Sequence, residues 1–363
     1  MYYNMGEEVK KLVYILTDPG YADSVWCRNF LDSLIDQLRK NRMTFGEVFD
    51  HVPTDAEAVF IIASNYNWTR ETIKRLNSSG IFPILISNNT EHLPGCVYSS
   101  VSSDIYGSIK QLLSQIGDKP AAVYGVNTNS LSDISKVDLL FSYSEDKSDK
   151  LRLFYYDGSL ENCFNAFMEN GNSIESVICT SDLAAVSLVR NLIQKAPDRL
   201  DGLTVYSLTG GTLSRYYSPY IKSLNIDYSP FGKAAIHLYK MIQKHKYISG
   251  ASLKVSWNTT DTPAVTSPIE IDQTWEGGDF SRDEEIREMM AIEKLLDCAD
   301  ATDRNIIRGL LAQKTLSELT CECFLTENAL KYRIKKILAV SGFADKQDLV
   351  GTLKKYVHSA EEL

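Results

Sequence analysis

Short apolar runs alternate with amphipathic segments from residue 11 to about residue 257. Runs such as AVFIIAS and FPILIS are rich in β-branched residues and apolar throughout, which predicts strands that are covered on both faces. The segments between them, such as SDLAAVSLVRNLIQ, repeat apolar residues at helical spacing. The order predicts an α/β protein with parallel sheets. Because the alternation runs on for ~240 residues, we expect two lobes instead of one sheet.

The pattern changes near residue 273. The stretch QTWEGGDFSRDEE is polar and contains glycine, which predicts a linker. Ser281 and Glu284 have the spacing of a capping box, so a helix is expected over 281–298. It either packs on its own domain or serves as a signalling or dimer helix. Its apolar stripe consists of Ile286, Met289, Met290, Ile292, Leu295 and Leu296.

Four short helices are predicted from Thr302 onward. The third begins at Thr326, a favoured N-cap residue, and Leu325 and Leu330 have the spacing of a hydrophobic staple. Two short helices joined by a tight turn, the second of them basic, fit the major groove of DNA. The apolar face of this second helix is Leu330, Ile334, Ile337 and Leu338. Its outward face is Asn328, Lys331, Tyr332, Lys335 and Lys336.

Charge is distributed unevenly along the chain. The net charge of −9 taken alone argues against a nucleic-acid partner. Residues 302–356, however, contain ten Lys/Arg and six Asp/Glu, a net of +4 that leaves −13 for the rest. An acidic body with a basic tail keeps double-stranded DNA as the expected partner of the tail.

Residues 302–357 resemble the LuxR/GerE-type helix–turn–helix domain, through the stretch TLSELTCECFLTENALKYRIKKILAVSGFADKQDLV. The resemblance implies that Lys331 makes base or groove contacts, with Asn328 and Tyr332 beside it. It also implies phosphate contacts by Thr326, Arg333 and Lys335. The sequence departs from the family pattern at 302–305, which reads Thr-Asp-Arg-Asn, and at Tyr332, where a smaller polar residue is common.

In the body, the residues that follow each apolar run are candidates for a ligand site, because parallel sheets bind ligands beyond the carboxyl ends of their strands. These residues are rich in amide, hydroxyl and aromatic groups, which suit a neutral polar ligand. Helix capping is the alternative role of Ser181 and Asp182. The candidates are Asp18, Tyr21, Asn65, Tyr66, Trp68, Ser87, Asn88, Asn127, Asn129, Asp157, Ser181, Asp182 and Thr209.

Residues of about 10–270 resemble the effector-binding domain of the LacI/GalR family, which is related to periplasmic sugar-binding proteins. The stretches VSSDIYGSIKQLL, SVICTSDLAAVSLVRNLIQ, LTVYSLTGG and IDYSPFGKAAIHLYKMI carry the resemblance. It implies two doubly wound lobes joined by three crossovers, with an effector in the cleft. The ligand-binding Arg of the family falls near Ser135 or Lys136, its late Asp near Thr209 or Gly210, and its Asn-Asp pair reads Ser181-Asp182.

These patterns divide the chain into three parts. The effector-binding domain is expected over 1–272, with lobe 1 at about 10–103 and 228–270 and lobe 2 at about 118–227. The linker and connecting helix occupy 273–300, and the helix–turn–helix domain occupies 301–363.

The sequence therefore predicts a ligand-responsive transcription regulator that is a homodimer and not an enzyme. No nucleotide-binding or catalytic motif is present. Cys321 and Cys323 lie about 200° apart on a short helix and cannot hold one metal from one face, and neither a metal nor a cofactor is expected. Seven scattered Cys and the lack of an ~18-residue apolar run indicate the cytoplasm and no membrane partner. The alternative is an adaptor whose cleft binds a protein or no ligand.

Overall fold

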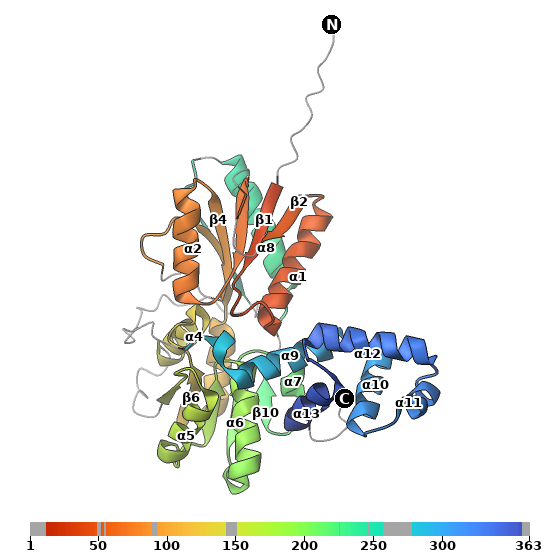
Figure 1. Cartoon of the computed structure of the whole chain (residues 1–363). Coiled ribbons are helices and arrows are strands. Elements are labelled where there is room, and N and C mark those ends of the chain that lie inside the picture. Colours follow the sequence, from red (N-terminus) through yellow and green to blue (C-terminus); the bar gives the residue numbers. More distant parts are fainter. Residues whose placement is uncertain are drawn as a thin grey trace.

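The computed structural model describes residues 12–48, 52–53, 56–88, 93–142, 151–224, 226–245, 247–256 and 278–357. Two α/β lobes, together called the body, lie one above the other, and the C-terminal helices lie beside the lower lobe (Figure 1). Each lobe contains one sheet in which all strands are parallel. The predicted fold class of two doubly wound parallel sheets is confirmed.

Lobe 1 is built on a six-stranded sheet in the order β11-β5-β4-β3-β1-β2. Val13 and Ile15 of β1 pack with helices α1 and α8, whereas Tyr14 and Leu16 pack on the opposite face with α2. Because both faces are covered, β3 is buried along its whole length. The elements are β1 (Leu12–Thr17), α1 (Val25–Lys40), β2 (Thr44–Val48), β3 (Ala58–Ile62), α2 (Tyr66–Ser78), β4 (Phe82–Ser87), β5 (Ser99–Asp104), α8 (Ser229–Lys244) and β11 (Ser252–Ser256).

Lobe 2 is built on a five-stranded sheet in the order β10-β9-β8-β6-β7, with α3 and α4 on one face and α5 and α6 on the other. Gly125 of β6 has a φ of +76°, and a Cβ there would lie 2.7 Å from the Cβ of Ala184 on α6, so this approach of helix to strand requires glycine. The elements are α3 (Tyr106–Ile116), β6 (Ala121–Val126), α4 (Leu131–Ser142), β7 (Leu151–Tyr155), α5 (Leu160–Asn170), β8 (Ser176–Cys179), α6 (Asp182–Lys195), η2 (Pro197–Arg199), β9 (Thr204–Ser207), α7 (Thr212–Arg215) and β10 (Ile221–Ser223).

The chain passes between the lobes after β5, where it enters α3, and again after β10, where it enters α8. The third expected crossover follows β11 and falls in residues 257–277, outside the described residues. The described chain resumes at residue 278, where the segment η3 (Phe280–Arg282) leads into α9 (Glu284–Cys298).

The predicted capping box at Ser281 is wrong. The N-cap residue of α9 is Asp283, whose carboxylate accepts hydrogen bonds from Glu285 N at 2.9 Å and Ile286 N at 3.3 Å. One carboxylate thus satisfies two of the amides left unpaired at the start of the helix. Ser281 lies in the preceding turn, and its hydroxyl donates to Asp279 at 2.7 Å.

Helix α9 lies between lobe 2 and the C-terminal helices (Figure 1). All six residues of its predicted apolar stripe are buried within the chain. The stripe packs in the same cluster as residues of α6 and of the C-terminal helices. Because the stripe is buried inside the chain it is not available as a dimer surface, whereas a signalling role for α9 stays a prediction.

The four predicted C-terminal helices are present. The hydroxyl of Thr326 accepts from Ala329 N at 3.3 Å and caps the third of them, while Leu330, Ile334 and Ile337 are buried as predicted. Gly342, with a φ of +76°, ends this helix. The elements are α10 (Ala301–Leu311), α11 (Leu316–Glu322), α12 (Glu327–Ser341) and α13 (Lys346–Tyr356).

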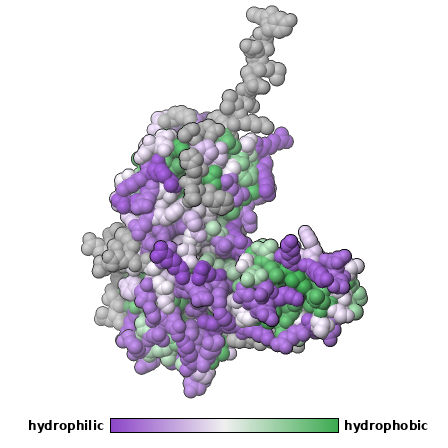
Figure 2. Space-filling model, viewed as in Figure 1, coloured by the Kyte–Doolittle hydropathy of each residue, from purple (hydrophilic) through white to green (hydrophobic). Residues whose placement is uncertain are grey.

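The surface differs between the two parts of the molecule. Hydrophilic residues cover most of the lower lobe on the face seen in Figure 2, whereas apolar residues gather on the C-terminal helices. None of the described helices combines the length and the apolar character needed to cross a membrane.

Candidate functional site

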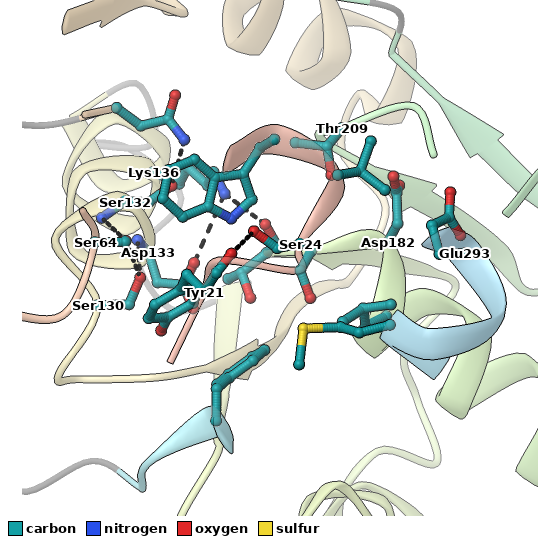
Figure 3. A pocket seen from close by; sticks show the side chains of 18 of the residues that line it. Tyr21, Ser24, Ser64, Ser130, Ser132, Asp133, Lys136, Asp182, Thr209 and Glu293 are labelled. Carbon is teal, nitrogen blue, oxygen red and sulfur yellow. Dashed lines mark hydrogen bonds and ion pairs between the residues drawn. The ribbon is translucent and has the colours of Figure 1, made fainter. Parts of the chain in front are cut away.

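A cavity of about 70 Å³ lies between the lobes. Side chains of lobe 1, lobe 2, η3 and α9 converge on it (Figure 3). Aromatic rings and the side chains of Val25, Leu183 and Met290 form the apolar part of its wall, and hydroxyl, amide and ionisable groups form the polar part, which is the composition of a site for a small polar molecule. The lining residues are Tyr21, Ser24, Val25, Trp26, Ser64, Asn88, Ser130, Ser132, Asp133, Lys136, Thr180, Ser181, Asp182, Leu183, Thr209, Gly210, Tyr228, Phe280, Met290 and Glu293.

Five of the predicted ligand-site residues line this cavity: Tyr21, Asn88, Ser181, Asp182 and Thr209. They follow β1, β4, β8 and β9, so the carboxyl ends of these parallel strands bring them together as expected. Ser181 also caps α6, since its hydroxyl accepts from Ala184 N at 3.1 Å. The capping role and the position in the cavity wall therefore coexist in this residue.

Two of the other predicted residues hold the strand ends of lobe 1 together. The buried Asp18 carboxylate accepts from Gly20 N and Asn65 N, both at 3.0 Å. Burial, partly offset by these amide hydrogen bonds, raises the pKa of Asp18 to about 6. The Asn65 side chain accepts from Trp68 N at 2.9 Å and caps α2. Neither Asp18 nor Asn65 lines the cavity.

The remaining six predicted residues, Ser87 and Asn129 among them, also lie away from the cavity wall. Tyr66 and Trp68 belong to the first turn of α2 and pack in its core cluster. The Asn127 side chain donates to Gly278 O at 3.0 Å and accepts from Asn129 N at 2.9 Å. The first of these bonds attaches lobe 2 to the segment from residue 278 onward, which leads into η3 and α9. Asp157 is exposed and accepts from the Asn162 amide at 3.3 Å.

A buried ammonium group lies in the cavity wall and was not among the predicted site residues. Lys136 of α4 donates to Thr180 O at 2.5 Å, and its Nζ lies 3.6 Å from the Asp133 carboxylate. Desolvation lowers the pKa of Lys136 and raises that of Asp133, while their mutual attraction opposes both shifts. The one signal for Lys136 in the sequence was its place near the family's ligand-binding Arg.

Two carboxylates meet at the start of α7. Asp182 accepts from Gly211 N and from the Ser207 hydroxyl. Glu293 of α9, which is also buried, accepts from Leu213 N at 2.7 Å and from Thr212 N. Figure 3 shows the two side chains beside each other at one end of the cavity. The sequence did not predict Glu293 as a site residue, because Glu293 lies on a helix that follows the body and not at the end of a strand.

The proximity of these carboxylates affects their protonation. Burial raises the pKa of Asp182 to about 6, against the hydrogen bonds from Ser207 and Gly211. Burial, followed by repulsion from Asp182 and Asp297, raises the pKa of Glu293 from its usual 4.5 to about 8. At neutral pH this pair is therefore expected to share a proton.

We expect the free energy of unfolding to fall as pH rises from about 4.5 to about 8. In that window Glu293 keeps a proton in the folded chain and loses it in the unfolded chain, so stability falls by up to about 1.4 kcal/mol per pH unit. Urea denaturation at several pH values measures this. Glu293→Gln is expected to flatten the profile, whereas Glu284→Gln, at an exposed position on the same helix, is not. Equal slopes in the wild type and Glu293→Gln would contradict the expectation.

Helix α9 connects the cavity with the C-terminal helices. Met290 and Glu293 line the cavity, and the same helix packs against α12 and α13. Glu288 of α9 accepts from Lys355 Nζ at 2.5 Å and from the Tyr356 hydroxyl at 2.9 Å. Tyr217 of lobe 2 donates to Tyr356 O at 2.8 Å. The C-terminal helices are thus held on the body by one buried, one half-buried and one exposed contact.

The predicted DNA-binding residues lie on α12 or at its start. Arg333 is half-buried and pairs with Asp300 at 2.8 Å and with Asp303 at 2.7 Å. Lys336 lies 3.2 Å from the same Asp303 carboxylate, and Lys331 lies 2.5 Å from Glu327. The exposed members of the set are Thr326, Asn328, Lys331, Tyr332, Lys335 and Lys336.

No protein-family model matches the chain. No curated protein matches its sequence. Among solved structures, a complex of the transcriptional regulator CelR with cellobiose has a TM-score of 0.54 at 11% identity, covering 68% of this chain and 82% of that chain. An ABC-transporter solute-binding protein from Agrobacterium vitis with bound allitol has a TM-score of 0.53 at 14% identity, covering 68% and 93%.

A third similar structure is a LacI-family transcriptional regulator from Enterococcus faecium with bound ribose. Its TM-score is 0.52 at 15% identity, and the match covers 72% of this chain and all of that one (100%). At such identities the likeness establishes the fold alone. The chain contains the two-lobed architecture shared by LacI-family regulators and the solute-binding proteins of ABC transporters.

Proposed function

We propose that the chain is a ligand-responsive, DNA-binding transcription regulator. A small polar effector binds in the cavity between the lobes, and α11 and α12 bind duplex DNA as a helix–turn–helix. The observation that carries the proposal is the position of α9, which lines the cavity with Met290 and Glu293 and packs against α12. Because one helix touches both candidate sites, a change at either site can bias the other.

The DNA-binding part of the proposal rests on the exposed face of α12. A helix enters the major groove with its N-terminal residues on the base edges, while cations hold the phosphates. Asn328, Lys331 and Tyr332 lie in the first half of α12 and are exposed. Lys335 and Lys336 follow as phosphate contacts. Arg333 is already paired with Asp300 and Asp303, so we assign it to fixing α12 on α10.

A sugar or another polyol suits the cavity best. Ser and Asn side chains in the wall offer hydrogen bonds to hydroxyl groups, and Trp26 and Tyr21 offer rings. The similar solved structures hold cellobiose, allitol and ribose. The cavity of about 70 Å³ is, however, smaller than the ~150 Å³ that holds benzene in an engineered protein cavity. An effector therefore requires the wall to open.

Phe280 is the part of the wall best placed to move with the effector. Its buried ring stacks on Tyr21 of lobe 1 at 5.4 Å and lies 4.9 Å from the ring of Tyr156 of lobe 2. Three residues later, Asp283 begins α9 and accepts from Leu160 N at 3.2 Å. Displacement of Phe280 by an effector would shift the start of α9 and, through it, α12.

Regulators of this kind act as dimers on paired half-sites about 34 Å apart, and we propose a homodimer in the cytoplasm. The apolar stripe of α9 and the Tyr356 ring of α13 are buried inside the chain. We therefore place the dimer surface on other elements.

We expect duplex binding to weaken with salt and to depend on α12. Lys331→Ala with Lys335→Ala removes two cations from the exposed face of α12 and is expected to lower the slope of log affinity against log salt by about 1–2. The slope is measured by fluorescence anisotropy with a 30-bp duplex. That duplex is first selected from a random pool by its binding to the wild-type protein. Lys110→Ala with Lys119→Ala, two exposed lysines of lobe 2, is the charge-matched control and is expected to leave the slope unchanged.

The same titration tests the effector. Cellobiose, ribose or allitol at millimolar concentration is expected to change the duplex affinity of the wild type. If the wild type shows no salt-sensitive binding to any duplex in the pool, the regulator proposal is contradicted. If it also shows no thermal shift with any polyol, the result would favour an adaptor that binds a protein.

A further inference from the structure

Three residues other than glycine have a left-handed backbone in the described part of the chain: Arg42, Gln313 and Phe324, with φ of 54°, 58° and 53°. Each is the second residue after a helix, and the residue that follows donates to the third carbonyl from the helix end. The bonds are Met43 N to Leu38 O, Lys314 N to Gly309 O and Leu325 N to Thr320 O, at 3.0, 2.9 and 3.1 Å. This is the Schellman ending, whose left-handed position favours glycine.

Phe324 differs from the other two in its chemistry. Arg42 and Gln313 are polar, whereas Phe324 is aromatic and its side chain is 95% exposed. A bulky residue in the left-handed region costs free energy that glycine would avoid. A ring so exposed recovers little of that cost by packing inside the chain. This combination points to a contact outside the chain.

The position of Phe324 indicates the kind of partner. It forms the turn between α11 and α12, two residues before Thr326 caps α12. The exposed lysines of α12, Lys331 and Lys335, belong to the same helix–turn–helix, and their charge complements a polyanion. Tyr332 of α12 is also 71% exposed, so two of the six large exposed apolar side chains of the described chain lie in this unit.

We propose that Phe324 is a specificity-determining contact to duplex DNA, with its ring packed on the C5-methyl groups of thymine beside the N-terminus of α12. The thymine methyl is the apolar group on the major-groove edges of the base pairs, so an exposed ring at this end of the helix selects A·T pairs. The inference rests on the proposed DNA-binding function and adds which pairs are preferred, and by which residue.

The test uses the full chain and two glycine substitutions. Phe324→Gly and Gln313→Gly place glycine in the same backbone conformation, and both are expected to keep or raise the melting temperature. Phe324→Gly is expected to weaken binding to the duplex selected by the wild type by about tenfold, the loss expected when one aromatic side chain is no longer buried. Gln313→Gly is expected to bind as the wild type does.

Replacing single thymines of that duplex with deoxyuridine removes one methyl group at a time. The wild type is expected to lose about fourfold in affinity at one or two positions, and Phe324→Gly is expected to lose nothing there. Equal binding by the wild type and Phe324→Gly, or equal responses to deoxyuridine, would overturn the role of Phe324 while leaving the regulator proposal standing. If the wild type selects no duplex, both the role of Phe324 and the regulator proposal are contradicted.

Discussion

Replacing Lys136 with methionine is expected to lower the free energy of unfolding by about 3–5 kcal/mol, because it leaves buried carboxylates without their cation. Lys136 and Asp133 are both buried, and the Lys136 Nζ lies 3.6 Å from Asp133 Oδ1. The Asp182 carboxylate also attracts the ammonium. Urea denaturation at pH 7 measures the loss. The loss is expected to shrink at pH 5, where the Asp133 carboxyl more readily takes up the proton that neutralises it.

The matched control is the double variant Lys136→Met with Asp133→Asn. Neutralising both partners removes the uncompensated charge, so the double variant is expected to recover most of the stability lost by Lys136→Met. A single variant as stable as the wild type would show that the ion pair contributes nothing. A double variant less stable than the single one would show that Asp133 acts chiefly through its bond from Asn127 N.

Replacing Tyr356 with alanine is the second large change, with an expected loss of about 3–5 kcal/mol. The Tyr356 ring is 1% exposed, and the Arg190 guanidinium lies 4.8 Å from its centroid. Its hydroxyl donates to Glu288 and its carbonyl accepts from Tyr217. Since these contacts join α13 to α9 and lobe 2, the C-terminal helices are expected to separate from the body at a lower urea concentration than the lobes unfold.

Tyr356→Phe separates packing from hydrogen bonding. It removes only the bond to Glu288 and is expected to cost about 1 kcal/mol. Hydrogen exchange of α13 and α9 amides, followed by mass spectrometry, locates the loss. If Tyr356→Ala leaves exchange in α13 unchanged, the docking seen in the structure does not hold these helices.

The sequence predicted the fold wherever strands are apolar along their length, as in β3 and β4. It did not indicate β5, which reads SSVSSD. Most of this strand is buried all the same, because its hydroxyls find partners: Ser100 pairs with Ser252 of β11 at 2.8 Å, and Ser103 donates to Asn88 at 2.6 Å. A polar strand that is stabilised by residues distant in the chain has no hydrophobic pattern of its own, so its sequence does not predict it.

The site was predictable in the same partial way. The rule of strand ends found Tyr21, Asn88, Ser181, Asp182 and Thr209, but it also selected Asp18 and Asn65, whose side chains hold loops and cap a helix. It had no means to find groups that reach the cavity from helices or from the C-terminal segment. Lys136, Phe280 and Glu293 are of that kind: the family resemblance alone pointed to Lys136, and only their tertiary positions show that Phe280 and Glu293 line the cavity.

Helix α9 also bears on how separable the two parts of this protein are. Many sensors and DNA-binding domains are joined by a linker that can be cut or exchanged. Here a cut before α9 would leave Thr212 N and Leu213 N without the Glu293 carboxylate and would uncover apolar residues of α6. A cut after α9 would instead expose the face of α9 on which α12 packs. Grafting this DNA-binding unit onto another sensor therefore requires transplanting part of the cavity wall with it.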